Sequence, residues 1–242
     1  MVFDYTNYDE LTYLQSDGSA FIETGFYPTY SLCEMDILFP SLPSTLSYYL
    51  GSLATNAYYP LASSSVNKFG FRYGANVRWS DVDMVANTRY NIKSFGSANS
   101  QYLDIDNVRV LNRTDTFSIN VQSNYLIFGY RTSGVNTPSR PYRLYYLRIY
   151  NTDNELMHEF IPARKKNGLV LGMYDTVDEV FYNNSGTGAF IGGEVIPHDT
   201  ASMKLKANGQ WKDTTPYIKV NGVWKQAIPY IKVNGVWKKA IQ

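Results

Sequence analysis

Residues 142–164 read YRLYYLRIYNTDNELMHEFIPAR and contain two strand-like runs, YRLYYLRIYN and HEFIPAR, on either side of a polar turn-forming stretch. Tyr, Leu, Ile and Phe favour strands, whereas Asn and Asp favour turns. In TFSINV (116–121), Phe117, Ile119 and Val121 share one face with the period of two that is typical of a strand on a core. Similar runs recur along the chain, among them CEMDILF, KFGFRYG, TRYNIKSF, QYLDIDNVRVLN and NYLIFGYR.

Helical periodicity is nearly absent, and the best helical candidate is a turn or two in SDVDMVAN (80–87). Many short strands separated by Gly, Pro, Asn, Asp and Ser are typical of an antiparallel sandwich and not of alternating strands and helices. The sequence therefore predicts an all-β protein.

The chain length of 242 residues is enough for one large β domain with a real core. The single cysteine, Cys33, excludes an intrachain disulfide, and its apolar surroundings in LCEMDILF favour a buried thiol. The first ten residues are acidic where a secretion signal is basic, and no apolar run approaches membrane-spanning length. We therefore expect a protein made in a cytoplasm, without membrane insertion.

Charge divides the chain into two parts. Residues 1–200 carry 14 Lys and Arg against 20 Asp and Glu, a formal charge of −6, while residues 201–242 carry 8 Lys against Asp213, a formal charge of +7. The lysines of the second part are spaced regularly within an apolar pattern, which favours solvated strand faces over a nucleic-acid surface. A nucleic-acid role would instead require salt-sensitive DNA binding. The predicted domains are residues 1–197 and 198–242.

The second part is a tandem repeat. PYIKVNGVWKQAI (216–228) is followed at once by PYIKVNGVWKKAI, and a degenerate copy precedes them, so we expect three β-hairpins over about 203–215, 216–228 and 229–242. Asn-Gly between alternating strand residues is a strong hairpin signal. Each hairpin has apolar groups on both faces and is marginal alone, so we expect oligomerisation or docking. The residues that we assign to this role are Trp211, Trp224, Trp237, Tyr217, Tyr230, Asn221, Gly222, Asn234 and Gly235.

LTYLQSDGSAFIETGFYPT (11–29), QYLDIDNVRVLN, NYLIFGYR and the run 142–190 together resemble the laminin-G-like, concanavalin-like jelly-roll domains of bacteriophage structural proteins and related bacterial proteins. The resemblance covers roughly residues 11–193. It implies two packed antiparallel sheets, a curved face that often binds glycans, and a place on a virion or cell surface. The terminal KVNGVWK repeats resemble C-terminal repeats of phage tail and fibre proteins, which implies other virion proteins as partners and favours a homotrimer.

No catalytic constellation stands out in the sequence. Retaining β-glucanases of this fold carry E-x-D-x-x-E on one strand, and the nearest match, Glu34 and Asp36, is followed by Phe39 where the general acid would stand. Asp104 and Asp106 share one face of a strand, an arrangement that is common in solvated positions. The histidines, His158 and His198, have no evident catalytic partner. We therefore predict that the chain is not an enzyme.

Glycan binding needs exposed aromatic rings beside polar side chains. The segments YYLGSLATNAYYP and FRYGANVRWSD supply both, although tyrosines that alternate in a sandwich are more often packing residues. Trp79 stands in a polar, loop-like stretch and is the strongest candidate. The full glycan-binding prediction comprises Trp79, Tyr73, Arg78, Asn76 and Asp81.

The sequence indicates no cofactor. One cysteine and two histidines exclude zinc in practice. The resemblance leaves calcium open, with loop aspartates as ligands, and the candidates are Asp81, Asp83, Asp104 and Asp106. No spacing among these four is diagnostic.

These observations predict a bacteriophage virion protein of the fibre or decoration type. Its jelly roll would adhere to host-surface polysaccharide, and its repeats would attach or oligomerise it on the virion surface. A purely structural decoration protein without glycan binding is one alternative. An inactive or weak glycan-hydrolase-like module is another.

Overall fold

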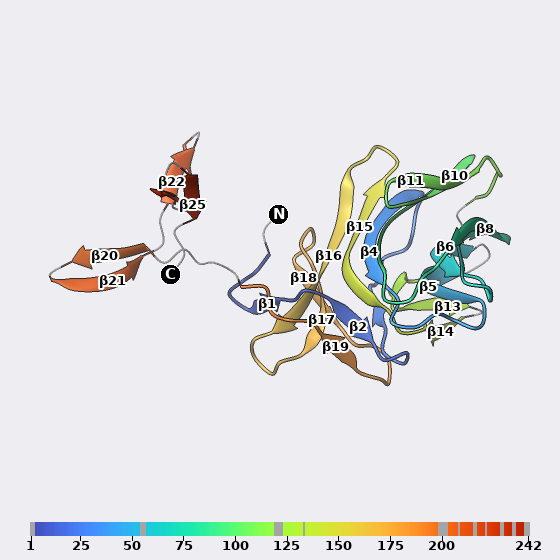
Figure 1. The fold of residues 1–242 in the computed structure, drawn as a ribbon, viewed down its shortest axis with the longest axis horizontal. Coiled ribbons are helices and arrows are strands. Elements are labelled where there is room, and N and C mark those ends of the chain that lie inside the picture. The colour runs from blue at the N-terminus through green and yellow to red at the C-terminus, as the bar shows by residue number, and fades with distance from the viewer. Residues whose placement is uncertain are drawn as a thin grey trace. The chain divides into compact units, whose positions relative to one another are not determined.

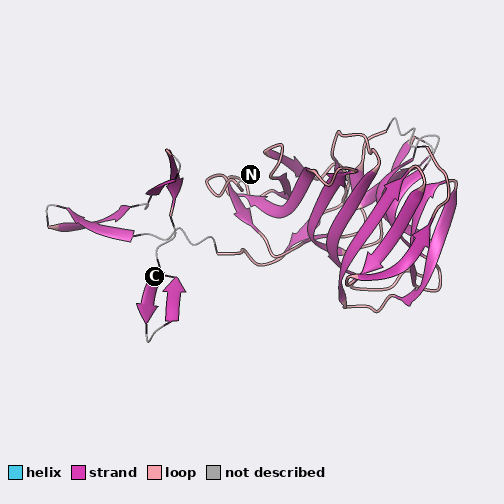
Figure 2. Cartoon of the chain, turned by 90° about the horizontal axis from the view of Figure 1, so that it is seen from above, coloured by secondary structure: helices cyan, strands magenta, loops and turns pink. Residues whose placement is uncertain are grey.

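The computed structural model describes residues 3–53, 57–118, 123–132, 134–197, 203–207, 209–214, 217–220, 222–227, 230–233 and 236–239. The chain divides into two compact units, Met1–Ile196 and Pro197–Gln242. All regular structure in the described residues is β-strand, and almost all of the first unit is built from antiparallel sheets (Figures 1 and 2). The all-β antiparallel sandwich predicted from the sequence is confirmed.

The larger sheet has eleven antiparallel strands, with the order β11-β10-β9-β4-β15-β16-β17-β18 along its main path. Strands β1, β2 and β19 pair with this path at β16, β15 and β2. The bounds are β1 Tyr8–Glu10, β2 Leu14–Ser16, β4 Ser31–Leu38, β9 Arg89–Ser97, β10 Ser100–Ile105, β11 Val108–Arg113, β15 Arg143–Asn151, β16 Leu156–Lys165, β17 Leu171–Asp175, β18 Val180–Asn183 and β19 Phe190–Gly192.

The smaller sheet has six strands in the order β3-β12-β5-β6-β7-β8, and a separate hairpin, β13-β14, stands beside it. The bounds are β3 Ile22–Glu23, β5 Ser47–Leu53, β6 Ala57–Ser63, β7 Lys68–Gly74, β8 Asn76–Asp83, β12 Leu126–Ile127, β13 Gly129–Thr132 and β14 Val135–Pro138. Figure 1 shows β13 and β14 next to β5 at one side of the first unit.

The core lies between the two sheets because the strands alternate strictly. Burial in β4 switches at every residue, so Cys33, Met35 and Ile37 face inward while Glu34 and Asp36 face outward. Strand β9 alternates in the same way. The inward residues of both sheets form one hydrophobic cluster. Since a shift of one residue would expose all of them, this alternation fixes the register of the sheet.

Strand β6 departs from alternation, because all seven of its residues are buried. One face of β6 contributes Tyr58 and Leu61 to the main core, and the other contributes Tyr59 and Ala62 to a second cluster. Tyr130 of β13 packs against this second cluster, and the Tyr59 hydroxyl donates to the carbonyl oxygen of Arg131 at 2.6 Å. The β13-β14 hairpin therefore covers part of the outer face of the six-stranded sheet.

One local expectation is wrong, and a second is wrong in the part that the structure describes. The helical turn expected in SDVDMVAN is absent: Ser80–Asp83 belongs to β8 and residues 84–87 form a loop and turn. The pairing of β8 with β7 supplies backbone partners that a short helix would not have. Of the strand expected at TFSINV, residues 116–118 lie outside any strand and residues 119–121 lie outside the described part of the chain.

The second unit contains three two-stranded hairpins, described by backbone pairing. They are β20 Met203–Ala207 with β21 Gln210–Thr214, β22 Tyr217–Val220 with β23 Val223–Gln226, and β24 Tyr230–Val233 with β25 Val236–Lys239. The register places a lysine opposite a tryptophan in each one: Lys206 and Trp211, Lys219 and Trp224, Lys232 and Trp237. Gly209 and Gly222 adopt positive φ at the turns, +78° and +83°.

Among the described residues, no helix is long and apolar enough to cross a membrane.

Candidate functional site

The outer face of the six-stranded sheet carries two rows of side chains fixed by strand register. Tyr48 of β5 pairs with Ala62 of β6, Ala62 with Gly70 of β7, and Gly70 with Trp79 of β8. Small residues thus separate two aromatic ones. A Cβ atom on Gly70 would collide with the indole of Trp79 and with the carbonyl oxygen of Arg78, so the indole lies directly against the Gly70 backbone.

The second row comprises Tyr59, Arg72 and Val77. Tyr59 is fully buried beneath two other tyrosines: its ring stacks on Tyr48 at 4.2 Å between centroids, and Tyr130 meets it edge-on at 5.7 Å. Tyr130 also meets the Tyr48 ring edge-on at 5.3 Å. Burial raises the pKa of Tyr59, which keeps its hydroxyl a neutral donor to Arg131. The three rings form a rigid aromatic group on the sheet surface.

A cavity of about 280 Å³ opens beside this aromatic group. Tyr48 and Tyr130 supply its aromatic surface, and serine, threonine and arginine side chains supply its polar surface. We call it the Tyr48–Tyr130 cavity, and its lining consists of Gly18, Thr45, Leu46, Ser47, Tyr48, Tyr130, Pro138, Ser139 and Arg140. The lining comes from three separate places, namely the turn at Gly18, the start of β5 and the β13-β14 hairpin with the residues that follow it.

Arginine donors near the aromatic group are incompletely paired. The Nε atoms of Arg72 and Arg131 are buried and have no hydrogen-bond partner among the described residues. Within the part of the chain that the structure describes, Arg72 donates only a long hydrogen bond, 3.5 Å from Nη1, to the Tyr48 hydroxyl, and Arg131 Nη1 lies 3.9 Å from Glu23 Oε1. A buried donor without a partner costs about 1–3 kcal/mol. Such donors are expected where a ligand or water completes the bonding.

The predicted glycan-binding residues are separated by the structure. Trp79 is half-buried and packs against the second cluster, which consists of Tyr48, Ala57, Tyr59 and Ala62. It stands in strand β8 and not in a loop, so that part of the prediction is wrong although the residue faces outward. Tyr73 faces the opposite way. It is 5% exposed in the main core and its hydroxyl lies 2.7 Å from Ser94 Oγ, because its strand position points between the sheets.

The other three predicted residues do not join the aromatic group. Arg78 Nε donates to Asp115 Oδ2 at 2.8 Å, and its Nη2 lies 2.7 Å from the same oxygen. Asn76 is exposed at the start of β8. Asp81 is exposed, and its backbone carbonyl accepts from Lys68 Nζ at 2.7 Å. Period-two alternation in β8 turns Arg78 away from the face that carries Val77 and Trp79.

The four aspartates considered for calcium do not gather at one place. Asp83 pairs with Lys68 at 2.7 Å, and Asp104 pairs with Arg109. Asp106 accepts the backbone N–H of Asn91 at 2.9 Å. Since Asp81 and Asp83 stand on β8 of the smaller sheet while Asp104 stands on β10 of the larger one, these residues do not fit a shared calcium site.

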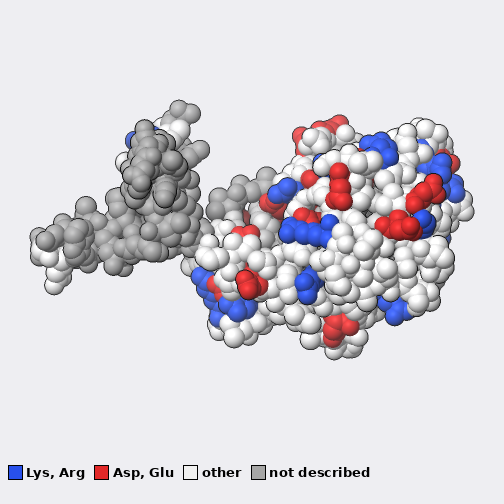
Figure 3. Space-filling model, viewed as in Figure 1, with Lys and Arg blue, Asp and Glu red and all other residues white. Residues whose placement is uncertain are grey.

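Acidic residues on the larger sheet are mostly neutralised across strands. Glu34 lies 3.6 Å from Lys93, and Asp36 receives two hydrogen bonds from Arg89, at 2.7 and 2.8 Å. Figure 3 shows Lys and Arg interleaved with Asp and Glu on the face of the first unit that it displays. The strand that most resembles a glucanase motif therefore carries ion-paired carboxylates.

A second cavity, of about 200 Å³, lies between the sheets and is mostly apolar. Its lining consists of Phe26, Tyr27, Pro28, Thr29, Ser31, Tyr58, Tyr125, Ile149, Met157 and His158. Hydroxyls of Ser31 and Tyr58 bond to each other at its buried end. The sequence shows no evident partner for His158, and the structure places it in β16 with Asp175 as partner.

The residues predicted for docking are only partly described. Trp224 is 65% exposed and Tyr217 is 58% exposed, and Lys219 Nζ lies 5.7 Å from the centre of the Trp224 ring system. Gly222 stands at the turn between β22 and β23. The side chains of Trp211, Trp237 and Tyr230 lie outside the described part, and Asn221, Asn234 and Gly235 lie outside the described residues altogether.

Tyr130, Arg131 and Arg140 are the site residues that sequence reasoning missed. Tyr130 and Arg131 end the strand-like run NYLIFGYR, and Arg140 follows it along the chain, but nothing in the sequence says that this hairpin lies over β5 and β6. Tyr48, Tyr59 and Arg72 did stand in segments considered for glycan binding. The available signal was the large number of tyrosines in these segments, which does not show which rings face the core and which face solvent.

No protein-family model matches the chain, and no curated protein sequence matches it. Among solved structures, a Bacteroides ovatus protein thought to bind carbohydrate superimposes with a TM-score of 0.54 at 10% identity, covering 77% of this chain and 61% of its own. A heptameric SAP-like pentraxin of Limulus polyphemus gives a TM-score of 0.46 at 8% identity, covering 79% and 97%. The carbohydrate-binding module CBM66 of Bacillus subtilis gives 0.37 at 16% identity, covering 58% and 93%.

The chain thus spans less than two thirds of the Bacteroides ovatus protein. That likeness agrees with the sandwich architecture described above. At 10% identity it concerns the fold alone.

Proposed function

We propose that the first unit, Met1–Ile196, is a glycan-binding module whose ligand occupies the Tyr48–Tyr130 cavity. The observation that carries the proposal is a cavity of about 280 Å³ lined by two tyrosine rings, hydroxyl groups and Arg140. The buried Nε atoms of Arg72 and Arg131, which have no partner among the described residues, lie in the neighbouring aromatic group and not in the lining. A sugar ring presents an apolar C–H face and a rim of hydroxyls, and it therefore needs an aromatic surface beside hydrogen-bonding groups.

The size and position of the site suggest a short ligand. Ligand pockets commonly measure about 300–1,000 Å³, so this cavity accommodates one or two sugar units and not a long chain. Tyr48 joins the cavity to Arg72, and beyond Arg72 the same face carries Trp79. A longer glycan would continue from the cavity across this face toward the indole.

Fold likeness gives limited additional support. The Bacteroides ovatus protein that shares the sandwich is itself thought to bind carbohydrate. Because sandwiches of this kind serve many functions, the cavity and not the structural neighbour supports the proposal.

The second unit is proposed to attach or oligomerise the module on a bacteriophage virion, with a homotrimer as the favoured form. Hairpin β22-β23 exposes Ile218 (53%), Val223 (60%) and Trp224 (65%), a degree of apolar exposure that a lone hairpin in water does not sustain. The tandem repeat supplies the same residues again, so further copies of this chain are the proposed partners. The virion setting follows from the resemblance of the sequence to phage structural proteins.

Glycan binding is tested on an array of bacterial surface polysaccharides and their oligosaccharides, probed with the full chain. We expect retention on at least one glycan. The substitution Tyr130→Ala should weaken that binding about tenfold, or about 1.4 kcal/mol. Tyr27→Ala is the matched control, because Tyr27 is a tyrosine with 59% exposure that lines the other cavity. Absence of binding to every glycan, or equal binding by Tyr130→Ala, would refute the proposal.

Oligomerisation is tested separately by light scattering on the full chain and on a variant with Ser at Trp211, Trp224 and Trp237. The wild-type chain should have the mass of a trimer and the variant that of a monomer. A wild-type monomer, or a variant with unchanged mass, would show that the repeats do not join copies of this chain.

A further inference from the structure

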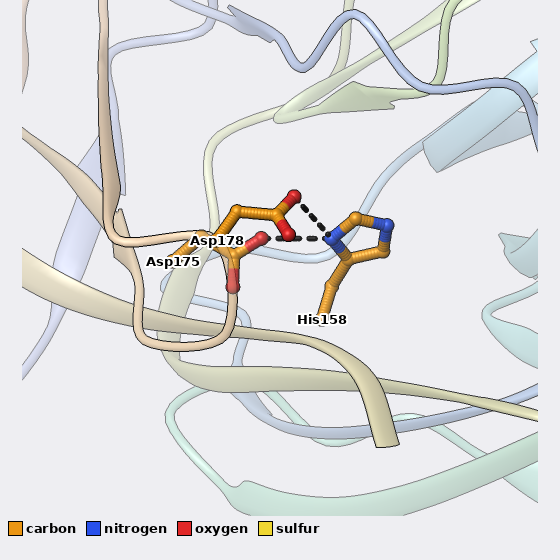
Figure 4. A group of neighbouring side chains, drawn as sticks. All are labelled: His158, Asp175 and Asp178. Atoms are coloured by element: carbon orange, nitrogen blue, oxygen red, sulfur yellow. Dashed lines mark hydrogen bonds and ion pairs between the residues drawn. The ribbon is translucent and has the colours of Figure 1, made fainter. Parts of the chain in front are cut away.

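His158, Asp175 and Asp178 converge from strand β16 and from the end of β17 and the turn after it (Figure 4). Nδ1 of His158 lies 2.8 Å from Asp175 Oδ2 and 3.4 Å from Asp178 Oδ2. One ligand atom of each residue lies within 4.8 Å of those of the other two. Figure 4 shows both carboxylates pointing at the same ring nitrogen.

We propose that these three residues bind Zn²⁺ in preference to Mn²⁺ and Ca²⁺, which would correct the exclusion of zinc drawn from the count of one cysteine and two histidines. This inference goes beyond glycan binding and does not depend on it.

The spacing of the three donors is close to that of a metal site. Zinc lies about 2.0–2.2 Å from imidazole nitrogen and carboxylate oxygen, so two donors of a tetrahedral ion are about 3.3 Å apart. The distance from His158 to Asp178, 3.4 Å, already has this value. The distance from His158 to Asp175, 2.8 Å, needs to widen by about half an ångström, a small side-chain adjustment.

Two of the three side chains are held in place by their surroundings. Asp175 is fully buried, and its Oδ1 accepts the backbone N–H groups of Glu159, at 3.2 Å, and Val177, at 3.0 Å, which leaves Oδ2 for a ligand. The His158 ring stacks on Phe26 at 4.3 Å between centroids. Outer contacts of this kind orient the ligands of metal sites.

Local charge favours a cation. Among the residues that the structure describes, neither Asp175 nor Asp178 forms an ion pair with lysine or arginine, and His158 is the only ion-pair partner of both. A buried carboxylate needs compensating charge. The two carboxylates meet at this point, and a divalent ion would supply the compensating positive charge.

The donor types select the class of ion. Calcium and magnesium prefer sites made of oxygen alone, whereas imidazole together with carboxylate suits zinc and its neighbours in the first transition row. Asp178, at 49% side-chain exposure, marks the solvent side of the cluster. Water can therefore complete the coordination from there, and the ion would tie β16 to the turn that follows β17.

Calorimetric titration of the full chain with Zn²⁺, after dialysis against a chelator, tests the proposal. We expect one equivalent to bind and to raise the unfolding temperature. Asp178→Asn should weaken binding about tenfold or more. Glu179→Gln is the matched control, since Glu179 is exposed and adjacent in the same turn. His198→Gln controls for binding by the other histidine of the chain, and both controls should bind as the wild type does.

A second variant distinguishes the loss of a metal ligand from misfolding of the protein. His158→Phe keeps a ring against Phe26 and removes the nitrogen ligand, so it should abolish the zinc-dependent rise in unfolding temperature. Parallel titrations use Mn²⁺ and Ca²⁺, and affinity should fall in the order Zn²⁺, Mn²⁺, Ca²⁺. The absence of saturable binding, undiminished binding by Asp178→Asn, or a preference for Ca²⁺ would overturn the proposal and leave the three residues as an internal ion pair.

Discussion

Replacing Arg72 by methionine should lower the affinity for glycan without lowering the stability of the protein. Arg72 Nε is buried without a partner among the described residues, and its Nη1 donates only a 3.5 Å hydrogen bond to the Tyr48 hydroxyl. Methionine keeps the apolar stem against Tyr59 and removes the charge. If the guanidinium is there for a ligand, its loss should not harm the fold.

The expected magnitude follows from the two contacts. Removing an unpaired buried donor recovers about 1–3 kcal/mol, and losing one long hydrogen bond costs at most about 0.5–1.5 kcal/mol. The free energy of unfolding of Arg72→Met should therefore lie between about 0.5 kcal/mol below and about 2.5 kcal/mol above that of the wild type. Glycan affinity should fall about tenfold, or about 1.4 kcal/mol.

Urea unfolding measures the free energy of unfolding, and titration with the glycan that binds best on the array measures the glycan affinity. Arg78→Met is the matched control: Arg78 stands on the neighbouring strand and pairs with Asp115, so its loss should cost about 0–1 kcal/mol and leave binding unchanged. If Arg72→Met destabilises the protein by more than about 2 kcal/mol and binds normally, Arg72 is a structural residue and the reasoning fails.

Three further predictions concern single positions. Gly70→Ala should displace the Trp79 indole, destabilise the protein by about 1–3 kcal/mol in urea unfolding and alter tryptophan fluorescence, because the new methyl collides with the indole and a backbone carbonyl; an unchanged spectrum and stability would contradict the packing. Burial raises the pKa of the Cys33 thiol to about 11, so at pH 8 a thiol reagent should label it only on unfolding, and fast labelling of the native chain would refute its burial. Hydrogen bonds from the backbone N–H of Ala189, then of Ser19 and Ala20, lower the pKa of Asp17, so its stabilisation is present above its unfolded pKa of about 3.9 and is lost as pH falls through the lower folded value. Asp17→Asn should accordingly destabilise the protein at pH 7 and have less effect near pH 2 in urea unfolding, and an effect that grows on acidification would contradict this sign.

The architecture was predictable because alternation is a local property. The run 142–164 became β15 and β16, paired antiparallel around the Asn-rich turn, with Leu147 opposite Phe160. The helical turn at 80–87 failed because pairing with β7 outweighed a weak local preference.

The candidate site was predictable only in part. The alternation of side chains along a strand predicts that Tyr58 and Tyr59 face opposite sides of the sheet, but it does not predict which of them faces the core. Because of the same ambiguity, Tyr73 was wrongly predicted to lie on the surface. The β13-β14 hairpin brings Tyr130 and Arg140 to Tyr48 from far along the chain. Asp175 and Asp178 come close to His158 because β16 pairs with β17 and because the turn after β17 follows directly. No spacing in the sequence predicts this cluster.

A crystal structure of the full chain with the best-binding oligosaccharide tests the central claim most directly. The account predicts a sugar ring against Tyr130 in the Tyr48–Tyr130 cavity, with a hydroxyl within hydrogen-bond distance of Arg72 or Arg140. A sugar bound instead in the cavity beside Phe26 and His158, or on the larger sheet, would contradict it.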